Sequence, residues 1–212
     1  MTVLTTAVDT SSDEYRANRD AMLAQLAVVA KEHDAAIAGG GPKYMERHRA
    51  RGKLLARERI ELLIDEDTAF LELSTLAGWG TDFVVGASEV TGIGVISGVE
   101  CVITAHDPTV KGGAMNLFSL KKGLRALDIA FENRMPLVQF VESGGGDLPG
   151  QKDFFVPGGR SFRDMTRMSA AGIPTIAIVM GNATAGGAYV PGMSDYVVMV
   201  KERSKVFLAG PP

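Results

Sequence analysis

The sequence predicts an α/β fold in which a parallel sheet is covered by helices. Two apolar runs, 136–141 (PLVQFV) and 174–180 (PTIAIVM), are too continuous to leave one face in water, which is typical of strands buried on both sides. Each run is followed by a glycine-rich turn and a helical segment, and this alternation is typical of βα units. The chain has 212 residues, of which 46% are hydrophobic, so it is long enough to bury a sizeable core.

Composition and charge exclude several classes of protein. A formal net charge of −3 indicates neither nucleic acid nor an anionic membrane as the main partner. No apolar stretch approaches the roughly 18 residues that span a bilayer, and the first residues lack the pattern of a signal peptide. A single cysteine, Cys101, excludes an intramolecular disulfide framework and a cysteine zinc cage, and it suits a reducing compartment, so we expect a cytoplasmic protein.

The first third of the chain predicts a helical extension outside the main core. Apolar residues recur at helical spacing over 13–38, and a Gly-Gly-Gly-Pro sequence then ends the helix. Residues 43–59 hold seven lysines and arginines against two acids and form a basic segment. We therefore expect three parts, which are a frayed tail (1–12), a helical extension with the basic segment (13–66) and a compact domain (67–212).

The compact domain begins with strands that pair antiparallel. Residues 70–73 alternate like a strand, and 89–96 and 100–105 predict two strands joined by a tight turn at Gly98. The clearest helix follows at 115–134, with leucines on one face. Its opposite, polar face is expected to carry Lys121, Lys122, Arg125 and Glu132.

The remaining elements alternate regularly. We expect strands at 137–141, 175–180 and 196–200, a helix at 160–171 and a short helix after the second glycine turn. The chain ends in an apolar, strand-like run at 206–212 with no closing helix, so the sequence looks truncated.

Two glycine turns follow the buried strands directly, at 144–146 and at Gly186 and Gly187. Strand C-termini and helix N-termini there leave backbone N–H groups that point into a common crevice and bind negative charge. The dinucleotide motif G-x-G-x-x-G fails because Pro149 occupies the sixth position, and the phosphate loop fails because Gly187 and Ala188 replace its lysine and hydroxyl. An uncharged turn suits an oxygen that becomes charged only during reaction, which is an oxyanion hole. Alternatively, Gly186 and Gly187 only let a helix pack closely on a strand.

Nucleophiles and bases are scarce. There is no G-x-S-x-G elbow, and the histidines at 33, 48 and 106 are scattered and without metal spacing, so each is expected to be structural or solvated and no metal is expected. Asp107 precedes a proline, which favours a turn. Glu142 and Asp147 flank the first glycine turn and could act as an acid/base pair, although Asp147 equally suits a cap of the following helix.

Several segments closely resemble the carboxyltransferase (beta) subunit of biotin-dependent acyl-CoA carboxylases. They are DPTVKGG (107–113), ESGGGDLP (142–149), MGNATAGGAYVPGMSD (180–195), FLAGPP (207–212) and RGKLLARERIELL (51–63). The resemblance is greater to the methylcrotonyl/geranyl-CoA carboxylase branch than to the propionyl branch. It implies a crotonase-like (ClpP/crotonase) core of ββα repeats behind the N-terminal helical extension. It also implies that a second such domain, present in relatives of more than twice this length, is missing here.

The resemblance implies transfer of CO₂ from carboxybiotin, carried by a partner, to a carbon of an acyl-CoA. The acyl-CoA must become an enolate, and the family's pattern assigns the two N–H donors for its oxygen to Gly186 and Gly187. Neighbouring acyl-CoA-binding positions are implied at Gly144, Gly145, Gly146, Ala185 and Ala188. The base is thought to be the ureido nitrogen of biotin itself, so a side-chain base is not required.

Lys111, Arg51 and Lys53 are candidates for the CoA phosphates, because lysine and arginine suit groups that carry charge throughout. A solvated basic face is an alternative for the helical segment. The implied partners are a biotin carboxylase/biotin carrier (alpha) subunit and further beta subunits, in a hexamer. Two other functions stay open, namely a biotin-independent hydratase or isomerase that uses Glu142 or Asp147, and a non-catalytic CoA-binding or assembly module.

Overall fold

The structure, a computed structural model, describes residues 5–209 of the chain. Its helices are α1 (Asp13–Ala38), α2 (Pro42–Ala50), α3 (Ala56–Glu61), α4 (Leu117–Asn133), α5 (Gln151–Ala170) and α6 (Tyr189–Met193). Its strands are β1 (Leu71–Leu73), β2 (Glu89–Ile96), β3 (Val99–His106), β4 (Leu137–Ser143), β5 (Thr175–Thr184), β6 (Tyr196–Met199) and β7 (Lys205–Phe207). None of the helices in this range combines the length and apolar character that crossing a bilayer requires.

The strands form one mixed sheet. Their order is β1-β2-β3-β4-β5-β6, and β7 pairs with the far half of the long strand β5. The first two pairings are antiparallel, and those from β3 to β6 are parallel. The predicted antiparallel corner and the parallel βα units are thus confirmed. The predicted run at 206–212 contributes the end of β7, and its residues 210–212 lie outside the described range.

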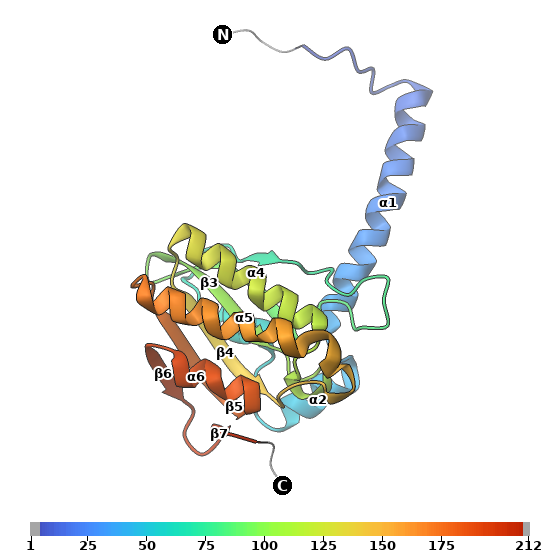
Figure 1. Ribbon diagram of the computed structural model, residues 1–212. Helices are drawn as coiled ribbons and strands as arrows, with labels where there is room; N and C mark the ends of the chain where they lie inside the picture. Colours follow the sequence, from blue (N-terminus) through green and yellow to red (C-terminus); the bar gives the residue numbers. More distant parts are fainter. Residues whose placement is uncertain (1–4, 210–212) are drawn as a thin grey trace.

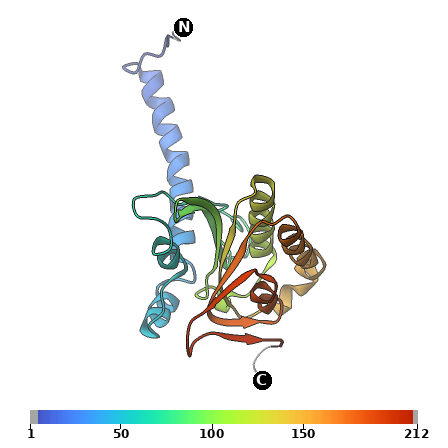
Figure 2. The same cartoon turned by 90° about the vertical axis from the view of Figure 1, so that its left-hand side faces the viewer.

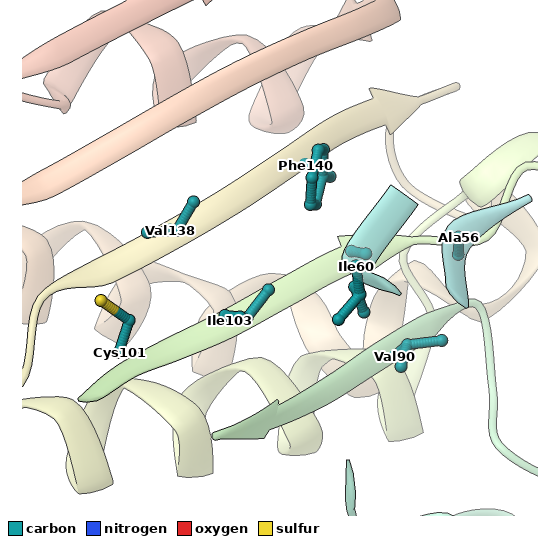
Figure 3. Close-up of a cluster of buried hydrophobic side chains, with 8 residues drawn as sticks. Ala56, Ile60, Val90, Cys101, Ile103, Val138 and Phe140 are labelled. Atoms are coloured by element: carbon teal, nitrogen blue, oxygen red, sulfur yellow. The ribbon is translucent and has the colours of Figure 1, made fainter. Parts of the chain in front are cut away.

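Helices pack on both faces of the sheet, although the residues of the edge strand β6 are all exposed (Figure 2). On one face, α3 places Ala56 and Ile60 against Val90, Ile103 and Phe140 of three adjacent strands. Figure 3 shows these side chains on the same side of β2, β3 and β4, with helices behind the sheet. On the other face, α4 and α5 cover the sheet and enclose a second apolar cluster, which consists of Val102, Ala126, Leu127, Ala130, Leu137, Met165, Met168 and Ile173 (Figure 1). Since the strand period is two, successive residues of β4 face opposite layers.

The N-terminal extension is helical, as predicted. The Ser12 hydroxyl caps α1 by accepting from the Tyr15 N–H at 3.1 Å. Of the residues of α1, only Ala36, near its end, is buried, and the helix projects from the body of the molecule (Figure 1). The extension is not wholly separate from the core, because α3 contributes Ala56 and Ile60 to it.

Two predictions about the helices are wrong. The helix predicted at 160–171 begins at Gln151, so that Pro157 lies inside α5. The proline removes a helical hydrogen bond, but buried Phe154 on the preceding turn anchors the helix. Lys122, predicted on the polar face of α4, is buried, and its ammonium donates to the carbonyls of Gly86 at 3.0 Å and Glu89 at 2.5 Å.

Candidate active site

The two glycine turns lie side by side at the carboxyl ends of β4 and β5. These strands are parallel neighbours, and their register ends with Ser143 opposite Ala183. The turns also pack against each other: a methyl group built on Gly145 would lie 3.5 Å from the Thr184 carbonyl oxygen, and one on Gly187 would lie 3.3 Å from Ser143 Cβ. The crevice predicted at this edge of the sheet therefore exists.

Backbone hydrogen bonds hold the first turn in place. Gly144 N–H donates to the Gly112 carbonyl at 3.0 Å, and Gly145 N–H donates to Ser143 Oγ at 3.1 Å. The Gly145 carbonyl accepts from Met115 N–H at 2.7 Å. Gly145 has a φ of +97°, a backbone conformation that residues other than glycine rarely adopt. Two of its three N–H groups, those of Gly144 and Gly145, are thus engaged by the protein itself.

The second turn is short and open. β5 ends at Thr184, and Ala185 follows with φ +48°, which costs a residue with a side chain on the order of 1–2 kcal/mol. Residues Ala185–Ala188 form a single 3₁₀ turn that leads into α6. The first N–H groups of such a turn have no acceptor within it. Gly186 occupies such a position, and a methyl group on it would meet no atom within 4 Å. Gly187 is the third residue of the turn, and within residues 5–209 its N–H has no hydrogen bond outside the i→i−3 pattern of the turn itself.

Both turns line one cavity of about 310 Å³ between the sheet and helices α4 and α5. Gly145, Gly146, Ala185, Gly186 and Gly187 belong to its wall at the end of the strands. Gly144 and Ala188, predicted as acyl-CoA-binding residues, adjoin these glycines in the chain but are not among the residues that line it. The remaining walls are mostly apolar and include Leu120, Leu124, Phe154, Phe155 and Met165.

Glu142 points to the other face of the sheet and is neutralised there. Its carboxylate accepts from the guanidinium of Arg59 at 2.6 Å and from the ammonium of Lys53. Burial opposes ionisation, but these two cations together hold the pKa of Glu142 below its ordinary value. A carboxylate so paired, on the face away from the cavity, is poorly suited to serve as an acid or base there.

Asp147 does not cap a helix, so that prediction is wrong. No backbone N–H of the following turn donates to its side chain. Its carboxylate instead pairs with the Lys111 ammonium at 2.8 Å and ties the first glycine turn to the loop after β3. The predicted turn at Asp107 is confirmed, since its carboxylate accepts from Thr109 N–H at 2.9 Å and its carbonyl from Val110 N–H at 3.1 Å.

Only two of the three residues predicted to bind the phosphates of CoA lie together in the structure. Arg51 and Lys111 line one side cleft of about 420 Å³, and Arg47 lies there as well. Lys53 does not line this cleft; its ammonium is engaged by Glu142, which disfavours a phosphate role. Arg57 of the basic segment pairs with Glu72 at 2.8 Å. Much of the basic segment is therefore internally paired rather than free as a solvated face.

A polar cluster in the sheet wall of the cavity was not predicted. Glu89, Thr104 and Gln139 lie on three neighbouring strands and all line the cavity. The signal for Gln139 was present in the sequence, because it is the one polar residue of the run PLVQFV. His106 also lines the cavity, where burial lowers the pKa of its imidazole.

Comparisons with known proteins agree with this geometry. Residues 47–212 match the family model of the carboxyl transferase domain. Over 210 residues the chain is 62% identical to the probable biotin-dependent acyl-coenzyme A carboxylase beta2 subunit of Mycobacterium tuberculosis (strain ATCC 25618 / H37Rv), and the match covers 99% of this chain and 40% of that protein.

Solved structures give the same result. The beta subunit of P. aeruginosa geranyl-CoA carboxylase has a TM-score of 0.90 and 42% identity, over 99% of this chain and 40% of that one. Transcarboxylase 12S, a hexamer with methylmalonyl-coenzyme A bound, has a TM-score of 0.81 and 28% identity, over 90% of this chain and 38% of that one. The chain thus spans about two-fifths of the length of these relatives. The greater similarity to the geranyl-CoA enzyme confirms the predicted branch, and the crotonase-like fold is confirmed.

Proposed function

The chain belongs to the carboxyl transferase family, and we propose that it is the acyl-CoA-binding part of the carboxyltransferase subunit of a biotin-dependent acyl-CoA carboxylase. The observation that carries the proposal is the pair of glycine turns opening on one apolar cavity. The cavity suits an acyl group, and the uncharged second turn suits its thioester oxygen.

The catalytic role of this chain is to stabilise an enolate. When bound beside the acyl-CoA, carboxybiotin would supply the CO₂ that the acyl carbon takes up and, having lost it, a basic ureido nitrogen for the proton that leaves that carbon. As that proton leaves, negative charge develops on the thioester oxygen, and the N–H groups of Gly186 and Gly187 donate to it. Preorganised N–H donors suit this task because they stabilise charge that exists only during the reaction. Gly145 and Gly146 shape the facing wall.

Arg51 and Arg47 would hold the phosphates of CoA at the side cleft. Lys111 also lines this cleft and, although paired with Asp147, stays far more exposed than Lys53, so it would add a third cation. Phosphates carry charge throughout the reaction, so permanent cations suit them, whereas the oxygen of the enolate requires neutral donors. The proposal also includes a biotin-bearing alpha subunit and a hexamer of beta subunits, which the hexameric relative supports. A cytoplasmic location agrees with the single, buried cysteine.

The two competing functions are less well supported. A hydratase or isomerase would need Glu142 or Asp147 at the substrate, but both carboxylates are ion-paired and neither lines the cavity. A purely structural CoA-binding module would not need the second turn to be open.

The test measures carboxylation by the protein purified from its native cells together with any subunits that accompany it. The expected result is ATP-dependent transfer of ¹⁴C from bicarbonate to acyl-CoA, and avidin should abolish it. Hydration of an enoyl-CoA in the presence of avidin would support the hydratase instead. Acyl-CoA binding without either reaction would support the structural module.

A further inference from the structure

Part of the cavity wall is polar where a simple hydrocarbon pocket would be apolar. Glu89 is on β2, Thr104 on β3 and Gln139 on β4, and we call these three residues the polar floor. Thr104 is the register partner of Gln139 on the neighbouring strand. All three line the same cavity as Gly186 and Gly187.

Gln139 has a hydrogen-bonding group with no partner. Three buried side-chain atoms in residues 5–209 lack one, namely Arg59 Nη1, Gln139 Nε2 and Thr184 Oγ1. Of these three residues, only Gln139 lines the cavity. A buried polar atom left unpaired carries a desolvation penalty, so a hydrogen-bonding group that enters the cavity would favour rotation of the Gln139 amide toward it.

Glu89 adds a second group at the floor. Burial raises the pKa of its carboxyl to about 7, although the nearby Lys122 ammonium and a hydrogen bond from Thr104 oppose this rise. Around neutral pH this carboxyl can therefore either donate or accept a hydrogen bond. An anionic ligand group would be repelled by its ionised form. A neutral hydroxyl, which both accepts and donates, suits both Gln139 and Glu89.

The length of the cavity indicates where that hydroxyl would lie. Gln139 and Ser143 face the same side of β4 and are four residues apart, which corresponds to about 13 Å along a strand. Ser143 adjoins Gly187, where the thioester oxygen would sit. A distance of about 13 Å is spanned by roughly ten bonds of an extended chain. Gln139 would therefore lie about ten bonds along an acyl chain from the thioester, and Leu137 continues the cavity wall beyond it.

We propose that the polar floor selects acyl-CoA substrates that carry a hydroxyl group near the far end of a medium-length acyl chain. This inference rests on the proposed function and adds a substrate class to it. Gln139 is the specificity-determining residue, since its amide bonds to the hydroxyl, and Glu89 provides the second hydrogen-bonding group.

The test compares two thioesters of equal length, decanoyl-CoA and 10-hydroxydecanoyl-CoA. Their dissociation constants are measured by calorimetry on the protein purified from its native cells and on variants made in the same full-length chain. The wild type should bind the hydroxylated thioester about tenfold more tightly. Gln139→Leu should reverse the preference, because a buried hydroxyl then loses its partner. Leu137→Met, which replaces a side chain on the same face of β4 by one of similar volume, should keep the preference for the hydroxylated thioester.

Each other outcome has a definite meaning. Equal affinities in the wild type and in Gln139→Leu, or a wild-type preference for the plain chain, would overturn the role of the floor and leave water as the partner of Gln139. If neither thioester binds to the correctly folded wild type, the acyl-CoA site itself is absent, and the proposed function fails with it.

Discussion

The two glycine turns have similar sequences and adjacent positions but different local structures. The first turn, 144–146, is bound on both sides to the loop after β3, and Gly145 sits at a positive φ. In the second turn, Gly186 and Gly187 have backbone angles that any residue can adopt, and Gly186 has open space beside it. Glycine is therefore needed at 145 for the shape of the chain and at 187 for close approach to Ser143, whereas a side chain at 186 would have open space beside it.

Charge distribution reinforces this difference. The first turn follows Glu142, which is neutralised by Arg59 and Lys53, and is followed by Asp147, which is paired with Lys111. The second turn is flanked by Thr184 and Tyr189 and carries no ionisable group. A rigid, charge-anchored wall thus faces a neutral turn, which suits an oxygen that is charged only briefly.

The largest effect on stability is expected from Glu142→Gln. The variant leaves Arg59 buried without a counter-charge, so the free energy of unfolding should fall by about 3–5 kcal/mol, measured by urea denaturation. Activity per folded molecule should persist because Glu142 faces away from the cavity. Glu58→Gln, in a more exposed pair with Arg49, is the control and should cost less than about 1 kcal/mol. A stable but inactive Glu142→Gln would indicate a catalytic carboxylate and favour the hydratase.

Gly187→Pro should have the largest effect on catalysis. It removes one N–H donor, and the loss of one such donor in other enzymes lowers kcat by about 10²–10³-fold. The dissociation constant of acyl-CoA should change by only a few-fold. Gly186→Ala keeps both donors and places its methyl group in open space, so it serves as the control. Normal turnover by a folded Gly187→Pro would show that the oxyanion assignment is wrong.

Gly145→Ala should reduce stability rather than catalysis. Forcing alanine to φ +97° should lower the free energy of unfolding by about 1–3 kcal/mol, while activity per folded molecule remains. Gly144→Ala is the matched control, because its φ is ordinary and its methyl group would lie 3.6 Å from the nearest atom, the Gly112 carbonyl oxygen. If Gly145→Ala were fully stable yet inactive, the first turn would be catalytic rather than structural.

The smallest effect concerns pH. Burial lowers the pKa of His106 below its ordinary 6.5, so the unfolded chain binds this proton first as the pH falls. Stability should therefore fall below about pH 6.5, by up to about 1.4 kcal/mol per pH unit from this group. His106→Gln should weaken the dependence of the free energy of unfolding on pH in this range, measured by denaturation at several pH values. An unchanged slope would mean that His106 is not held neutral in the folded protein.

The order and type of the elements were predictable because buried parallel strands and glycine turns leave strong local patterns. The start of α5 was not, because Pro157 is normally a helix breaker and only the tertiary contacts of Phe154 reveal that it is tolerated. The burial of Lys122 depends on two carbonyls more than thirty residues away in the chain, which no periodicity shows.

The candidate site was predictable to a similar extent. The sequence located both glycine turns, but it could not tell that Gly144 and Gly145 bond their N–H groups within the protein. One acceptor is the Gly112 carbonyl on another loop, and the other is the Ser143 hydroxyl, which is itself oriented by its bond to the Gly113 carbonyl. Lys53 and Arg51 look alike in the basic segment, yet only Arg51 lines the side cleft, because Lys53 is drawn to the buried Glu142. Ion pairs between residues far apart in the sequence therefore decide which cationic side chains remain available to bind a phosphate.

The most direct test of the central claim is the infrared stretching frequency of the thioester carbonyl of acyl-CoA bound to the native protein. Donation from Gly186 and Gly187 polarises this carbonyl, so its frequency should fall below that of free acyl-CoA in water. The shift should be largely lost in Gly187→Pro and kept in Gly145→Ala. A shift that survives Gly187→Pro, or one that only Gly145→Ala removes, would contradict the assignment of the second turn as the oxyanion hole.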